Sequence, residues 1–254
     1  MTGDPDPAPP PDRGGGDRGP GGRCTGGHDA GGHDGGGHDA GGHDAGCHGT
    51  GDPATGLAVV ATTREVLARP ELHEGLLAPW ELRRLDAIRV PSRREDVVAV
   101  RLLLRSCVAR HTGLPLHRSG PAQLCPGCGR HGHGRPYLPG LPGVGLSLSH
   151  ADGVVAAAVG PGAIGIDVEP STRRPGPLRV LRRLLPEADL REAGAQPDPG
   201  PALLRLWVRE EALLKAGRET PLLLVEWSDH ERAAVAAVAS AGPTTVLPQP
   251  WGPG

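Results

Sequence analysis

The first 56 residues limit the possible fold most, because they offer almost no apolar side chains for a core. Between Gly26 and Thr50 a five-residue unit of the type Gly-Gly-His-Asp-Ala repeats, which places histidines at 28, 33, 38, 43 and 48. Burial cannot offset the entropy lost on ordering so many glycines. We therefore predict a disordered tail over residues 1–56 and a folded part that begins at Leu57.

The histidine repeat permits two interpretations. Imidazoles beside carboxylates suit Zn, Ni or Cu, so the chain can be a metal-handling protein that acts through this tail. Alternatively, the repeat has expanded without a function, which is the interpretation that we favour. Weak metal binding by the purified protein is expected in both cases.

Charge and composition exclude several classes of protein. The net charge of −2 lacks the positive excess of a nucleic-acid binder. No apolar run is long enough to span a membrane, and the first twenty residues contain no apolar signal segment. The five cysteines form no disulfide framework, so we expect a cytoplasmic protein. Because Phe is absent, the core from Leu57 onward must be mainly aliphatic.

Apolar periodicities predict a mixed α+β fold. Ser92 and Glu95 form a candidate capping box for the longest helix, and Gly113 follows its end. Residues 145–169 are predicted to form three antiparallel strands in a meander. The other expected elements are a strand at 57–62, helices at 81–88, 92–112, 178–185 and 202–216, and a last strand within 231–240.

The order of strand, helices and strands occurs twice. We therefore predict a pseudo-dimer of two similar α+β halves, residues 57–160 and 161–242, with an active site in the cleft between them. Residues 243–254, rich in Pro and Gly, are expected to be a second disordered tail.

The segment AIGIDVEP, Ala163 to Pro170, alternates in polarity like a half-buried strand. Asp167 and Glu169 then point to the same face, about 6.5–7 Å apart along the chain. Two carboxylates at this spacing can share a hard cation such as Mg²⁺. The alternative is that both acids simply face water.

The helical segment LWVREEALLKAG places Trp207, Glu211 and Lys215 at intervals of four residues. They line one edge of the apolar face, where Glu can bind a metal and Lys can bind a phosphate. The alternative is a surface Glu–Lys pair, worth only a few tenths of a kcal/mol.

A third set of candidates precedes these two segments. Arg135 lies in a Gly- and Pro-bounded loop, and Ser149 and His150 end a predicted strand, LSLSH. His150 can donate to a phosphate or can be a hairpin-end residue without a role. A cluster of arginines between 83 and 105, which includes Arg101, can form a local anion site.

The motifs GRPYLPGLPG, LSLSH, GIDVEP and WVREEALLK, in this order and spacing, resemble those of a known enzyme family. From about Leu76 to Ser240 the chain is similar to the surfactin-synthetase-activating type of 4'-phosphopantetheinyl transferase. The resemblance implies a holo-acyl-carrier-protein synthase type of activity. Such enzymes transfer the 4'-phosphopantetheine arm of coenzyme A to a serine of an apo carrier protein and release adenosine 3',5'-bisphosphate.

The resemblance also implies roles for particular residues. Asp167, Glu169 and Glu211 match acidic positions that hold Mg²⁺, and Glu211 also matches the proposed base. Lys215 matches a lysine that contacts phosphate. His150, with Ser149 before it, and Arg135 match positions around the nucleotide and its 3'-phosphate. Arg101 resembles a helix arginine that also faces this phosphate. The family type is usually monomeric.

One departure from the family pattern and one Cys/His loop raise further hypotheses. Glu210 stands where the family usually has lysine, so a charge reversal beside phosphate can leave a protein that binds coenzyme A but is catalytically impaired. In CPGCGRHGHG, Cys125, Cys128, His131 and His133 can ligate zinc. The spacing is too short for a standard zinc finger, so we favour a structural loop there.

Overall fold

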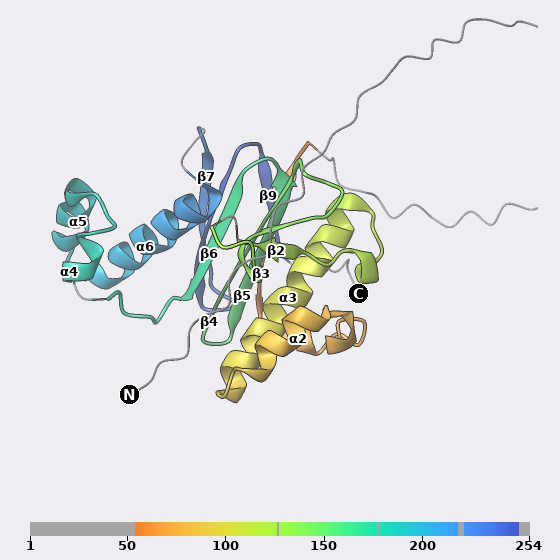
Figure 1. Cartoon of the computed structure of the whole chain (residues 1–254). Helices are drawn as coiled ribbons and strands as arrows, with labels where there is room; N and C mark the ends of the chain where they lie inside the picture. The colour runs from red at the N-terminus through yellow and green to blue at the C-terminus, as the bar shows by residue number, and fades with distance from the viewer. Residues whose placement is uncertain (1–53, 126, 177, 218–220, 249–254) are drawn as a thin grey trace, which may run out of the picture. The chain divides into compact units, whose positions relative to one another are not determined.

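The computed structural model describes residues 54–125, 127–176, 178–217 and 221–248 (Figure 1). The repeat that was predicted to be disordered and residues 249–254 lie outside the described residues. Of the helices described, none combines the length and apolarity needed to cross a bilayer.

The described part of the chain has a mixed α+β fold, as predicted. The first set of elements is β1 (Gly56–Thr62), α1 (Thr63–Leu67), α2 (Pro79–Asp86), α3 (Pro91–Thr112), β2 (Ala122–Leu124), β3 (His131–Tyr137), β4 (Val144–Ala151) and β5 (Val154–Pro161), with short 3₁₀ turns at Glu74–Leu76 and Leu116–Arg118. The second set is β6 (Ile164–Pro170), α4 (Leu178–Leu181), α5 (Glu187–Gly194), α6 (Pro199–Ala216), β7 (Leu223–Asp229), β8 (Ala234–Ser240) and β9 (Thr244–Leu247).

Two sheets pack face to face between two long helices. The larger sheet has the strand order β2-β3-β4-β5-β1-β9, and the smaller one has the order β6-β8-β7. Along β1, Leu57, Val59 and Ala61 pack towards α3. The alternate residues Ala58 and Val60 pack against the smaller sheet, together with the isoleucines and Val168 of β6.

Helix α6 covers the outer face of the smaller sheet. Val208, Ala212 and Ala216 of the helix pack with Ala237 and Ala239 of β8. Figure 1 shows α6 alongside the strands of this sheet. The residues at this contact are mostly small, so the helix and the sheet approach each other closely. The acidic residues of β6 alternate with its core residues and therefore point to the side that α6 covers.

The predicted three-stranded meander is wrong at its third strand. β4 and β5 form the expected hairpin, with Asp152 and Gly153 in its turn. β5 pairs with β1 on its other side, so neither edge of β5 is left for β6. After a turn at Gly162, whose φ is +72°, the chain enters the second sheet and β6 pairs with β8 instead.

Three other expectations are also corrected. The capping box at Ser92 is absent, because α3 begins one residue earlier, with Val90 at the N-cap and Pro91 in the first turn. Residues 244–247 form β9, parallel to β1, although they were expected to belong to a disordered tail. Five further elements were not predicted from the sequence: the strands β2, β3 and β7 and the helices α1 and α5.

Candidate functional site

The site is organised by a very close approach of α6 to β6 at Gly165. A Cβ atom at Gly165 would overlap the carbonyl oxygen of Ala212 and the amide nitrogen of Ala216, and would lie 2.9 Å from the carbonyl carbon of Lys215. Glycine is therefore the residue that lets the helix backbone rest on the strand. This explains why a glycine precedes the acids of the IGIDVEP strand.

The close approach brings Lys215 onto Asp167. The ammonium of Lys215 lies 2.6 Å from Asp167 Oδ1, and it also donates to the carbonyl oxygen of Ile166 at 3.1 Å. Ser149 Oγ donates to the same Asp167 oxygen at 2.7 Å and lies 3.0 Å from Lys215 Nζ. Residues of β4, β6 and α6, which are far apart in the sequence, thus meet in one network.

Both serines of LSLSH contact β6. Ser147 Oγ accepts a hydrogen bond from the amide of Ile166 at 3.0 Å, and Ser149 donates to Asp167. The two serines are two residues apart on a strand, so they point to the same side. They tie β4 of the larger sheet to β6 of the smaller one at the acidic residues.

The acids at 167 and 169 are buried. Asp167 is 5% exposed, and its second oxygen, Oδ2, is buried without a hydrogen-bond partner. Glu169 is 7% exposed and pairs with Arg173 at 2.6 Å. Burial raises the pKa of Glu169 to about 6, and the charge of Asp167 adds to this, although Arg173 opposes it.

Glu211 belongs to the same electrostatic environment. Burial raises the pKa of Glu211, the negative charge of Asp167 raises it further, and Lys215 opposes the shift. A glutamate with a raised pKa is better suited to accept a proton near neutral pH than an exposed one.

The three predicted metal ligands do not form a compact triad in the described residues. The group there with three ligand atoms within 4.8 Å of one another is Cys125, Cys128 and His133, not the three acids. The donor set nevertheless fits Mg²⁺, which prefers carboxylate oxygens. Asp167 Oδ2 has no hydrogen-bond partner and can accept a cation. Burial, with the charge of Asp167 added, raises the pKa of Glu169 and of Glu211, so a nearby cation would favour their charged forms.

A basic cavity is lined by His150, the residue that follows Ser149 on β4. Its volume is about 550 Å³, and its charged lining consists of arginines and His150, without an acidic residue: Arg84, Arg89, Arg93, Arg101 and His150. His150 and Arg93 also line a wider cavity of about 1410 Å³, which reaches Arg173. Burial lowers the pKa of His150, so its ring is mainly neutral at pH 7.

Arg101 faces this cavity while it is held by a buried ion pair. It donates to Glu81 at 2.7 Å and lies 5.0 Å from the ring centre of Trp80. Arg105 bonds the same carboxylate. Arg101 Nε is buried without a hydrogen-bond partner. The predicted anion-binding arginine is therefore positioned by α2.

Arg135 contacts the other side of the site. Its guanidinium donates to the carbonyl oxygen of Lys215 at 2.8 Å, at the C-terminal end of α6. A cation is favourable there, because the last carbonyl groups of a helix have no intrahelical partners. Arg135 of β3 thus anchors the residue whose side chain binds Asp167.

Glu210, the departure from the expected lysine, is half-buried beside Arg209. The two side chains are 3.6 Å apart, and Arg209 also bonds Asp189.

Arg173 was not predicted from the sequence to be a site residue. Its position four residues after Glu169 was the available signal, but residue 169 was predicted to end a strand, where that spacing carries little weight.

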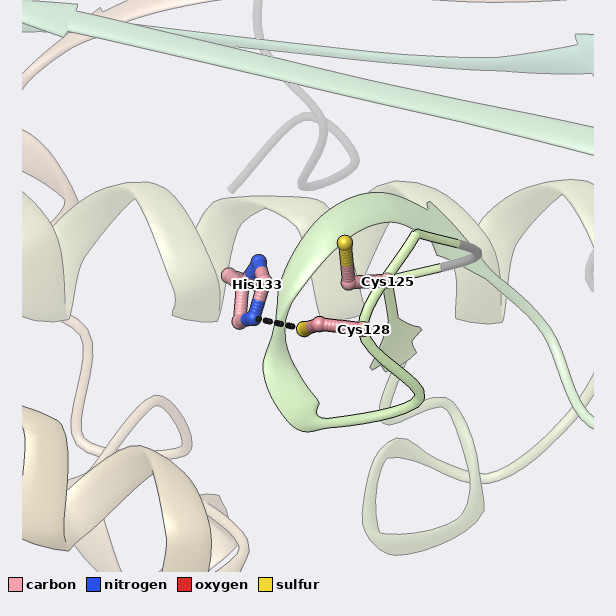
Figure 2. Close-up of side chains that lie close together, drawn as sticks. All are labelled: Cys125, Cys128 and His133. Atoms are coloured by element: carbon pink, nitrogen blue, oxygen red, sulfur yellow. Dashed lines mark hydrogen bonds between the residues drawn. The ribbon is translucent and has the colours of Figure 1, made fainter.

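Figure 2 shows the Cys/His loop, where Cys125, Cys128 and His133 lie together. Cys128 Sγ is 3.1 Å from His133 Nε2. Backbone hydrogen bonds from residues 128 and 127 lower the pKa of Cys125. The side chain of His131, the fourth predicted ligand, lies outside what the structure describes.

Comparison with known proteins finds two similarities. Residues 163–247 match the family model of the 4'-phosphopantetheinyl transferase superfamily. A 4'-phosphopantetheinyl transferase of Bacillus subtilis is 29% identical over 130 residues, which cover 50% of this chain and 54% of the relative. The chain thus spans about half the length of this relative. The resemblance found in the motifs is confirmed at the level of the superfamily.

Proposed function

We propose that the chain transfers 4'-phosphopantetheine from coenzyme A to a serine hydroxyl of an apo acyl or peptidyl carrier protein, as a holo-acyl-carrier-protein synthase of the surfactin-synthetase-activating type. One observation carries the proposal: Asp167, Lys215 and Ser149, from three separate elements, form one network, and His150, the next residue on β4, lines an arginine-rich cavity. Diphosphate chemistry needs this combination of acids and cations.

Coenzyme A would bind through its phosphates. The cavity beside α3 supplies several arginines and no acidic lining, which suits the 3'-phosphate of the adenosine. Neutral His150 retains one N–H donor for the same phosphate. His150 and Arg93 line both cavities, so the two spaces adjoin. The wider cavity is lined by Glu95, Asp96 and Asp152, and also by Arg173, which pairs with Glu169.

Asp167, Glu169 and Glu211 would hold Mg²⁺. When bound, the ion supplies positive charge that neutralises the diphosphate. The residues of the chain supply the remaining requirements. Lys215 fixes Asp167, and Arg173 orients Glu169. Arg135 holds the end of α6 from which the side chain of Lys215 extends.

The transfer forms a bond between the serine oxygen and the phosphorus next to pantetheine. The bond from this phosphorus to the bridging oxygen breaks, and adenosine 3',5'-bisphosphate leaves with that electron pair. Glu211 accepts the proton of the serine hydroxyl. Its raised pKa favours this role, because general bases work best when their pKa is near the working pH.

The test is transfer of a fluorescent coenzyme A analogue to a panel of apo carrier proteins. We expect label that depends on Mg²⁺ and on a carrier serine. Asp167→Asn, which keeps the shape but removes the charge, should lower the rate by about 100-fold or more. Asp86→Asn, an exposed substitution at the end of α2, is the matched control and should label normally. Equal rates for both variants would refute the assignment of Asp167.

The impaired-enzyme alternative rests on Glu210. Its half-buried carboxylate, 3.6 Å from Arg209, lies one residue before the proposed base. If the charge reversal impairs transfer, Glu210→Lys should raise the labelling rate and leave coenzyme A affinity in calorimetry within a few-fold. No gain from Glu210→Lys would argue against impairment.

We also infer a pseudo-dimeric architecture from two halves, 57–160 and 161–242, in a monomeric, cytoplasmic protein. In its support, each half carries one long helix, α3 or α6, on the outer face of its sheet, and the inner faces pack together. Light scattering of the full chain tests the monomer.

A further inference from the structure

The Cys/His loop lies outside the proposed transfer chemistry, yet it holds a compact group of metal-binding side chains. The two thiol sulfurs and one ring nitrogen, from Cys125, Cys128 and His133, lie within 4.8 Å of one another. In Figure 2 the three side chains come from the turn between β2 and β3 and from β3 itself. Cys128 and His133 are exposed, so an ion can reach them.

These separations fit one tetrahedral ion. Zinc binds sulfur at about 2.3 Å and nitrogen at about 2.0–2.1 Å, so ligand atoms on one ion lie roughly 3.5–4 Å apart. The separation of 3.1 Å between Cys128 Sγ and His133 Nε2 needs only a small opening to reach that value. Two thiolates and an imidazole are a donor set that prefers zinc to Mg²⁺ or Ca²⁺.

The backbone prepares the loop for this role. The amide of Cys125 donates to the carbonyl oxygen of Arg130 at 3.0 Å, and the amide of Gly129 donates to the carbonyl oxygen of Cys125 at 2.8 Å. Gly129 and Gly134 have positive φ values of +65° and +93°, which suit glycine. These turns return the chain so that His133 meets the two cysteines.

We propose that Cys125, Cys128 and His133 bind one zinc ion, with the fourth coordination position open to solvent. Sequence spacing favoured a purely structural loop, but the geometry favours a metal-linked one. The ion would close the β2–β3 hairpin at its tip. His133 and Arg135 are two residues apart on β3, so the zinc would also stiffen the strand that anchors the end of α6. This inference does not depend on the proposed transfer.

The test compares metal content in full-length variants after gel filtration in chelator-treated buffer. Wild type should retain one more zinc ion per chain than the double variant Cys125→Ser/Cys128→Ser. Inductively coupled plasma mass spectrometry measures this content. Cys24→Ser/Cys47→Ser is the matched control: it removes the same number of thiols from the tail and should keep that ion. The histidines of the repeat are unchanged in all three proteins, so their binding cancels in the comparison.

Cobalt substitution identifies the ligands. Wild type and the tail control should show a sulfur-to-cobalt charge-transfer band in the near ultraviolet, and Cys125→Ser/Cys128→Ser should lose it. His133→Ala changes one exposed side chain only and should weaken zinc affinity more than tenfold with an unchanged far-ultraviolet circular dichroism spectrum. Equal zinc content and equal bands in all variants would overturn the site, as would a Cys125–Cys128 disulfide in protein isolated from the cytoplasm.

Discussion

Substitution of Gly165 by alanine tests the contact on which the site depends. A methyl group at 165 would overlap two backbone atoms of α6, the carbonyl oxygen of Ala212 and the amide nitrogen of Ala216. Backbone atoms inside a helix cannot rotate away as a side chain can. The helix must therefore move as a body away from β6.

The expected cost follows from that displacement. Overpacking of a core by one methyl group costs about 1–3 kcal/mol, and a clash with backbone places Gly165→Ala near 3 kcal/mol. For a chain of this size this corresponds to a fall of roughly 6–12 °C in the melting temperature. The Lys215 ammonium, 2.6 Å from Asp167, would be pulled away with the helix. Transfer activity should thus fall further than the folded fraction does.

Urea denaturation and carrier labelling measure the two effects on the same protein. Gly143→Ala is the matched control, because a Cβ there meets nothing within 4 Å and the backbone is not left-handed. That substitution should change stability by less than about 1 kcal/mol, with a small gain allowed. If Gly165→Ala and Gly143→Ala unfold at the same urea concentration, the close approach of α6 to β6 is wrong.

Two further predictions concern buried acids. Burial raises the pKa of Glu169 to about 6, so its contribution to stability is complete below pH 4.5 and is lost as the pH rises through 6. The unfolding free energy of Glu169→Gln, relative to that of wild type, should therefore rise by up to about 2 kcal/mol as the pH increases from 4.5 to 8. Denaturation at each pH measures this difference. Glu81→Gln leaves Arg101 and Arg105 without their shared carboxylate. It should cost about 3–5 kcal/mol in unfolding free energy, whereas Glu74→Gln, at a partly exposed ion pair, should cost under about 1 kcal/mol.

The elements that could be predicted from the sequence are those whose apolar residues recur at a single spacing, either that of a strand or that of a helix. β1, the β4–β5 hairpin, α3 and α6 were predicted because their core residues recur at strand or helix spacing. β2 was missed because it has only three residues, and β3 was missed because it has few apolar residues and contains Gly and Pro. The change of sheet after β5 was missed because it depends on which strand occupies the neighbouring edge, and that strand, β1, is about a hundred residues away in sequence.

In the site, too, features set by one element could be predicted from the sequence, and contacts between distant elements could not. Asp167 and Glu169 were predictable as a pair, because alternation along one strand places both on one face. Their distance from Glu211 was not predictable, because it depends on how closely α6 packs, and Gly165 decides that contact. The resemblance to a family supplied the candidate residues. It did not indicate that Lys215 bonds Asp167 or that Arg135 binds the end of α6.

The two oxygens of Asp167 have different environments, and this difference has a measurable consequence. Oδ1 receives Lys215 and Ser149, whereas Oδ2 is buried without a partner. A cation placed at Oδ2 would oppose the negative charge that helps to hold the pKa of Glu169 near 6 and that raises the pKa of Glu211. Binding of Mg²⁺ at pH 6 should therefore release roughly half a proton from Glu169, and almost none at pH 8. Calorimetry in buffers of different ionisation enthalpy measures this number. Equal proton release at both pH values would mean that Mg²⁺ does not bind beside Glu169.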